Sequence, residues 1–148
     1  MTLAEKQQQL VDDLTVIPDG PERLSVVVDR ARRLPPLPEA ERTEAHRVRG
    51  CISQVWLLAE AREGRLYFRC DADGPLVKGL VHLVADFFSG ATPAEIAASD
   101  TDPLAALELD RNLSPTRRNG LAAVRARIRE LARAASQFHH EGHEAHEA

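Results

Sequence analysis

The chain has 148 residues, of which 43% are hydrophobic and 28% charged, and its formal net charge is −4. These values fit one globular domain, exclude disordered, collagen-like and disulfide-rich chains, and argue against broad nucleic-acid binding. No apolar run approaches the ~20 residues of a membrane span, and the first ten residues lack a signal-peptide core, so we expect a cytoplasmic protein.

Two helices are predicted at the start of the chain. A capping-box pattern at Thr2 and Glu5 precedes an apolar helical face, which predicts the first helix. Asp19 and Pro21 begin the second, whose apolar residues recur every three or four positions. Three prolines between positions 35 and 38 then impose an extended connection.

A hairpin is predicted next, because the periodicity changes from helical to alternating. The strands are expected at about 53–60 and 65–71, joined by a turn at 61–64. A short strand at 46–49 can pair with them, which makes a small antiparallel sheet of three strands. Trp56 is expected in the core.

The rest of the chain is predicted to be helical. Asp73 is expected to cap a helix that opens near Pro75 and stops at Gly90. Gly120 is unfavourable in a helix, so we expect close packing there. Further helices are expected to start after Thr92, Asp102 and Ser114. The fold class is therefore α+β, helices packed on one sheet face, with a single domain at 1–138 and a polar, His-rich flexible tail at 139–148.

The most informative residue is Cys51, which follows Gly50 just before the apolar strand. Glycine permits a sharp reversal, so the thiol is expected on a turn from which it can project. Nearby cations, Arg47 and Arg49 with His46, can lower the pKa of the thiol and make it reactive. On chemistry alone, a small apolar filler at a strand start remains the alternative.

The sequence around this cysteine resembles the active-site motif of the SufE family, sulfur-acceptor proteins that partner cysteine desulfurases in iron–sulfur cluster assembly. Further similar segments follow in the family's order and cover about residues 10–135. The matching segments are Gly50-Cys51-x-Ser53-x-Val55-Trp56-Leu57, Asp71-Ala72-Asp73, Leu76-Val77-Lys78-Gly79-Leu80, Phe88-Ser89-Gly90, Thr92-Pro93-x-Glu95-Ile96 and Leu113-Ser114-Pro115-x-Arg117-x-x-Gly120-Leu121.

The resemblance implies a compact fold shared with IscU-type scaffold proteins. It implies that Cys51 accepts persulfide sulfur from a desulfurase of the SufS or CsdA type, stimulates that enzyme, and delivers the sulfur to a downstream scaffold. The chain is then a carrier without a cofactor or metal of its own, since the pyridoxal phosphate belongs to the desulfurase. For such a carrier, the apolar Ile52 and Val55 are expected to line a sheltered position for the sulfur. Residues expected to bind the partner or tune the site are Arg49, Gly50, Asp71, Asp73 and Arg117.

Two residues depart from the family pattern. Cys70 stands where a glycine is usual, and His46 stands where an asparagine is common. Because Cys70 alternates in phase with Leu66 and Phe68, it is expected to face inward as a small apolar residue. A resolving thiol for Cys51 is the alternative.

Other functions remain to be weighed. An iron–sulfur scaffold needs several thiolates, and this chain offers two cysteines. A thiol peroxidase or redox sensor can use Cys51, but no peroxidatic surroundings are recognisable. The acidic turn at 71–74 lacks the later ligands of a calcium loop. The arginines of 111–133 are interpreted as a solvated helix face, and the tail histidines as incidental rather than a metal site.

Overall fold

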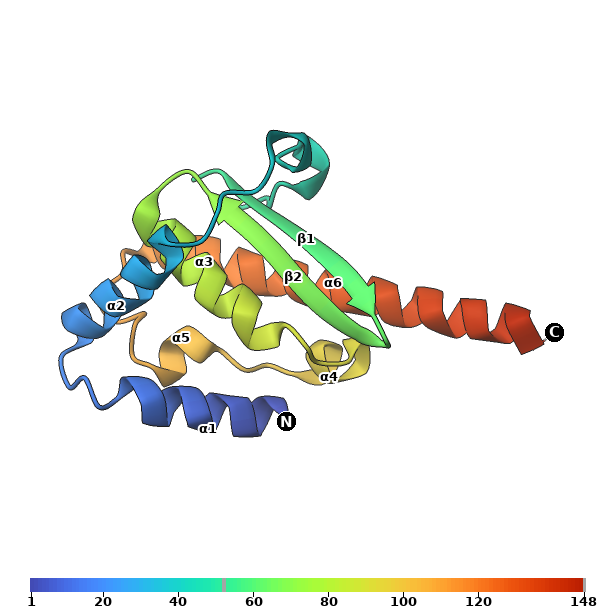
Figure 1. Ribbon diagram of the computed structural model, residues 1–148, viewed down its shortest axis with the longest axis horizontal. Coiled ribbons are helices and arrows are strands. Elements are labelled where there is room, and N and C mark those ends of the chain that lie inside the picture. Colours follow the sequence, from blue (N-terminus) through green and yellow to red (C-terminus); the bar gives the residue numbers. More distant parts are fainter. Residues whose placement is uncertain (52, 148) are drawn as a thin grey trace.

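The computed structural model describes residues 1–51 and 53–136 in full, and the helical backbone of 137–147. In this part of the chain, helices flank one antiparallel hairpin, so the α+β class is confirmed (Figure 1). The helices are α1 (Leu3–Leu14), α2 (Gly20–Arg32), α3 (Pro75–Phe88), α4 (Pro93–Ala98), α5 (Pro103–Ala106) and α6 (Pro115–Glu147), the 3-10 turns are η1 (Glu39–Glu41) and η2 (Glu44–His46), and the strands are β1 (Val55–Arg62) and β2 (Arg65–Ala72).

The helix starts follow from their capping side chains. The Thr2 hydroxyl accepts the Glu5 N–H at 3.1 Å, and the Glu5 carboxylate accepts the Thr2 N–H at 3.2 Å. This reciprocal pair is a capping box, as predicted. The Asp19 carboxylate accepts the Glu22 N–H at 3.2 Å and starts α2. The predicted caps of α4 and α5 are likewise confirmed at Thr92 and Asp102.

The helix α3 begins differently from the prediction. Its N-cap is Gly74, with no side-chain hydrogen bond, so Asp73 does not cap it. Pro75 at the first helical position has no N–H to satisfy and already has a helical φ, which reduces the need for a cap. The Asp73 N–H instead donates to the Gln54 carbonyl at 3.1 Å, and this bond ties the end of the hairpin to its beginning.

A two-residue turn sets the register of the hairpin. Glu63 and Gly64 both have positive φ, 52° and 77°, as in the turns whose twist matches that of paired strands. Arg62 therefore opposes Arg65, and the pairing continues to Val55 opposite Ala72.

The third strand predicted at 46–49 is wrong. The Val48 N–H donates to the Val55 carbonyl at 2.8 Å, and Arg47 forms one isolated bridge with Trp56. Gly50, at φ 90°, then turns the chain away before a ladder can grow. On the other edge, Leu66 forms a second isolated bridge with Ala91, so the sheet of the described residues has two strands.

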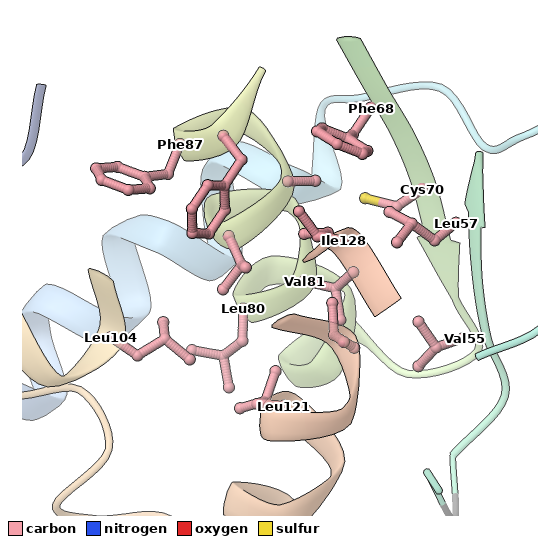
Figure 2. Packing of buried hydrophobic residues seen from close by; sticks show 14 of the residues in the cluster. Val55, Leu57, Phe68, Cys70, Leu80, Val81, Phe87, Leu104, Leu121 and Ile128 are labelled. Atoms are coloured by element: carbon pink, nitrogen blue, oxygen red, sulfur yellow. The ribbon is translucent and has the colours of Figure 1, made fainter. Parts of the chain in front are cut away.

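The core fills the space between one face of the hairpin and the helices. Figure 2 shows Leu57, Phe68 and Cys70 pointing from the strands toward the helical side, as the period of two requires. The helices contribute buried residues such as Leu80 and Ile128. Of the helices that the structure describes, none is long and apolar enough to cross a membrane.

The other face of the hairpin is partly covered by the connection between α2 and β1, the teal segment in Figure 1. Trp56 lies on this face, half-buried, and the guanidinium carbon of Arg42 lies 5.7 Å from its ring centroid. The prediction that Trp56 belongs to the core is therefore wrong. Its neighbours Val55 and Leu57 occupy the core face, and alternation sends Trp56 to the opposite side.

Candidate functional site

Cys51 lies on a sharp turn that packs against α6. Gly50 has a φ of 90°, which favours glycine, and a Cβ added there would lie 3.2 Å from the Ala123 Cβ. The turn thus touches the helix with almost no space between them. Its backbone conformation and its packing both require the glycine that precedes the cysteine.

The thiol of Cys51 is half-buried and hydrogen-bonded. Its Sγ donates to the Gly120 carbonyl of α6 at 3.1 Å. A Cβ on Gly120 would lie 3.5 Å from this sulfur, so the close packing predicted at Gly120 is confirmed. A carbonyl oxygen has two lone pairs, so it can accept the thiol in addition to a helical N–H.

Burial raises the pKa of the Cys51 thiol above its ordinary value, because a half-buried site disfavours the thiolate. The neighbouring cations that can lower this pKa do not outweigh the effect of burial. Arg47 pairs with Glu44 at 3.3 Å, and the Nδ1 of His46 lies 2.9 Å from the Glu41 carbonyl oxygen. Burial at this position therefore favours the protonated thiol.

A small cavity of about 40 Å³ adjoins the thiol. Its wall is mainly apolar and comes from β1, α3 and α6, whose packing Figure 2 shows from close by. The apolar residues that line it are Val55, Val77, Leu80, Val81, Leu121 and Val124. Ser53, Thr116 and Arg117 add polar groups. This is a sheltered space for a small group attached to Cys51.

Arg117 is the cation at this cavity. It lies in the first turn of α6, where the Ser114 hydroxyl accepts its backbone N–H at 3.2 Å. The residue is exposed and also lines the cavity. A cation near a helix N-terminus gains nothing from the helix dipole, so its place there is not explained by stability of the helix.

The other residues singled out from the sequence do not all meet at this site. Arg49 is exposed and lines a separate hollow, which shares no lining residue with the cavity. Asp73 is exposed at the end of the hairpin. Asp71 is only 3% exposed, and its carboxylate accepts the Leu37 N–H at 2.9 Å, which fastens the proline-rich connection to β2.

Cys70 faces the core, as predicted, and is 3% exposed. Burial, with the nearby Asp71 carboxylate as a smaller cause, raises the pKa of its thiol to about 12. Both cysteines are free. A thiol so buried and so weakly acidic has little thiolate for exchange chemistry.

One contact at the site was not foreseen from the sequence. The Gly120 carbonyl holds the thiol, and a backbone acceptor has no side chain by which a sequence could reveal it. The spacing of three residues between Arg117 and Gly120 does place both on neighbouring positions of one helix face, which is the only available signal. The predicted lining residue Val55 is confirmed, whereas Ile52 lies outside the described residues.

The described side chains contain no group of three His, Cys, Asp or Glu residues that could hold a metal ion. The four histidines of the predicted tail at 139–148 lie among residues whose side chains the structure does not describe.

Comparisons with known proteins agree with the family resemblance. The family model of SufE, an Fe-S metabolism associated domain, matches residues 8–132. An uncharacterized SufE-like protein of Rhizobium etli is 37% identical over 130 residues, which are 84% of this chain and 88% of the relative. A SufE-like protein of Synechocystis is 33% identical over 119 residues, covering 80% and 75% of the two chains. The chain belongs to the SufE family, and this ties it to iron–sulfur metabolism.

A solved structure supports the fold independently. The solution structure of a hypothetical protein from Thermus thermophilus superposes with a TM-score of 0.72 and covers 89% of this chain and 96% of that one. The two sequences are 22% identical, so this likeness bears on the fold alone.

Proposed function

We propose that the protein is a sulfur carrier that accepts sulfane sulfur on Cys51 from a cysteine desulfurase and passes it on to iron–sulfur cluster assembly. The Cys51 thiolate attacks the terminal sulfur of a persulfide on the partner. The new S–S bond forms as the old one breaks, and the partner cysteine leaves as a thiolate. No external oxidant or reductant takes part, as in thiol–disulfide exchange.

The observation that carries this proposal is the position of the thiol. Cys51 projects from a glycine-containing turn, its Sγ donates to the Gly120 carbonyl, and it adjoins a small, mainly apolar cavity. A carrier needs a nucleophile that can reach into another active site and a shelter for its cargo between transfers. The same turn provides both, because only a short segment must move to change between them.

The shelter has a chemical purpose. A persulfide exposed to water and small thiols is lost by exchange, so a carrier benefits when its sulfur is held against the protein. In the free protein, the hydrogen bond to Gly120 and the raised pKa of Cys51 keep the thiol unreactive. Docking on the desulfurase frees the turn and lets the thiol ionise.

Arg117 has a role in the transfer itself. Arg117 is exposed and lines the cavity, which supports a role in which its charge favours the thiolate form of Cys51 once the hydrogen bond to Gly120 is released, or holds the anionic persulfide afterwards. In this scheme the chain uses no cofactor of its own. The pyridoxal phosphate that removes sulfur from cysteine belongs to the desulfurase, and the receiver is a downstream scaffold.

The test is desulfurase activity on L-cysteine with and without this protein. We expect the wild type to stimulate the enzyme and Cys51→Ser to fold normally but not stimulate. Cys70→Ala is the matched control and should keep most of the stimulation, since that thiol is in the core. Stimulation that survives in Cys51→Ser would reject the proposal.

A second pair of variants tests the arginine. Arg117→Ala should slow sulfur transfer about tenfold. This change corresponds to ~1.4 kcal/mol of activation free energy, which is near the lower end of the cost of losing a charge-assisted hydrogen bond. Arg133→Ala removes another exposed arginine of α6, one that does not line the cavity beside Cys51, and it should leave the rate unchanged. Equal rates for both variants would remove Arg117 from the mechanism.

A further inference from the structure

A larger groove lies beside the segment that leads to Cys51, and it shares no lining residue with the cavity. It has a volume of about 380 Å³ and runs between α6 and the segment that leads from η2 to the turn. Its charged residues are Arg47 and Arg49 on one wall, Arg127 on the other, and Glu44 and Glu130 beside them. The uncharged residues that line it are Ala45, Val48, Ala123 and Ala126. This volume is within the usual range for a binding site.

The charges of the groove are not matched across it. Arg47 pairs with Glu44 at 3.3 Å, and Arg127 pairs with Glu130 at 3.1 Å. Both pairs join residues three positions apart on the same wall. Such exposed pairs contribute little stability, so each arginine can accept another carboxylate at small cost.

Arg49 gives the groove a net positive charge. Among the side chains that the structure describes, no carboxylate lies within ion-pair distance of Arg49, and the residue is exposed. With three arginines and two glutamates, the groove has a formal charge of +1, although the whole chain has −4. The positive charge is therefore local, and it favours a ligand that carries carboxylates.

The groove also touches the turn that holds the nucleophile. A Cβ on Gly50 would lie 3.2 Å from that of Ala123, which lines the groove. The Gly120 carbonyl, three residues earlier in α6, accepts the Cys51 thiol. Three residues span about 4.5 Å of helix axis, so an occupant of the groove lies directly beside the turn and the thiol.

We propose that this groove docks an acidic segment of the desulfurase, whose carboxylates engage Arg49 and Arg127 and whose bulk displaces the turn from α6. This inference rests on the proposed function and adds the surface through which the partner is recognised. Docking and release of Cys51 then become one event, because the segment that binds the partner is continuous with the turn. A long nucleic acid would need a basic surface wider than this groove between acidic neighbours.

The test is the affinity of the protein for the cysteine desulfurase of the same organism, measured by calorimetry at low and high salt. Arg49→Glu and Arg127→Glu should each bind about tenfold more weakly at low salt and should lose most of the salt dependence. Arg133→Glu carries the same change on α6 outside the groove and should bind within about twofold of the wild type. Thermal unfolding of each variant checks that the fold is intact.

A second measurement separates binding from chemistry. At saturating concentration, Arg49→Glu should still acquire sulfur on Cys51, whereas Cys51→Ser never does. Wild-type affinity in both groove variants, with normal sulfur transfer, would overturn the groove proposal and leave the carrier function standing. Failure of the wild type to take sulfur at all would reject the function itself. Self-association of the wild type that Arg49→Glu abolishes would assign the groove to a second copy of this chain and overturn the proposal.

Discussion

Cys51 is exposed enough to react, yet buried enough for its thiol to have low reactivity in the free protein. Its thiol is half-buried, donates to Gly120, and has a raised pKa. We predict that Cys51 alkylates several-fold more slowly in the folded protein than in denaturant at neutral pH. The alkylation rate rises with pH as the thiol ionises. The midpoint of this rise should lie at a higher pH in the folded protein than in denaturant, because the folded site disfavours the thiolate.

The measurement uses a Cys70→Ala background, so that alkylation reports Cys51 alone. Adding the desulfurase should accelerate the reaction if docking releases the turn. Alkylation of the free protein at the denatured rate would mean that the thiol is already open, and the sheltered state would then be wrong.

Cys70 gives a pH dependence to stability. Its folded pKa of about 12 is raised, so the native state keeps the proton after the unfolded state, near pH 8.5, has released it. The stabilising contribution is complete below pH 8.5 and is lost as the pH rises toward 12. We compare the free energy of unfolding of the wild type with that of Cys70→Ala. Between pH 7 and pH 10, this difference should shift by about 2 kcal/mol against the wild type.

Urea unfolding of both proteins at the two pH values gives this difference directly, because titrations common to both cancel. A constant difference between pH 7 and pH 10 would show that Cys70 ionises as readily in the folded state as in the unfolded one. With that result, Cys70 would again be a candidate for a reactive thiol.

At the scale of single residues, the sequence predicted which way a side chain faces better than it predicted the hydrogen-bond partner of that side chain. The inward position of Cys70 followed from strict alternation with Leu66 and Phe68. The hydrogen bond from Cys51 to Gly120 could not be predicted from the sequence, because it joins residues 69 positions apart through a backbone atom. The resemblance to the SufE family implied that Asp71 lies near the site, but its partner, the Leu37 N–H, is brought to it by tertiary structure.

At the scale of elements, the turn before β1 depends on its glycine for two reasons, a positive φ and contact with Ala123. Gly50→Ala should destabilise the protein by about 1–2 kcal/mol and also speed alkylation of Cys51, because the added methyl pushes the turn off α6. Gly64→Ala is the matched control. Gly64 has a φ of 77° but open space around it, so this variant should lose stability without exposing Cys51.

The two effects are read from urea unfolding and from the alkylation rate of the same samples. Equal alkylation of both glycine variants would mean that the contact with Ala123 does not hold the thiol in place.

Elements with strong local signals, including the hairpin joined by a tight turn, were predictable, whereas the third strand was not. The capping box of Thr2 and the alternation of β2 are encoded by neighbours in sequence. The third strand failed because one hydrogen bond, from Val48 to Val55, is not followed by another once Gly50 reverses the chain. Arg23, 5% exposed, donates to the carbonyls of Leu14, Ile17 and Leu107, and no local pattern revealed it.

At the scale of the whole molecule, Asp71 joins the proline-rich connection to the hairpin. Its carboxylate accepts the Leu37 N–H at 2.9 Å and lies 3.7 Å from the Lys78 ammonium of α3. Asp71→Ala leaves a buried donor without its partner, so we predict a loss of about 2–3 kcal/mol in the free energy of unfolding. The exposed Asp73→Ala should change it by less than about 0.5 kcal/mol.

Urea denaturation measures both variants, and sulfur transfer is assayed below the unfolding transition. If Asp71→Ala were as stable as the wild type yet inactive in transfer, Asp71 would belong to the functional site rather than to the framework.

The central claim is that Cys51 carries sulfur. Its most direct test is mass spectrometry of the protein after incubation with the desulfurase and L-cysteine, without reductant. We expect one added sulfur atom on the peptide that contains Cys51, and none when Cys51→Ser is used. Added sulfur on Cys70 alone, or an unmodified Cys51 beside an active desulfurase, would contradict the account.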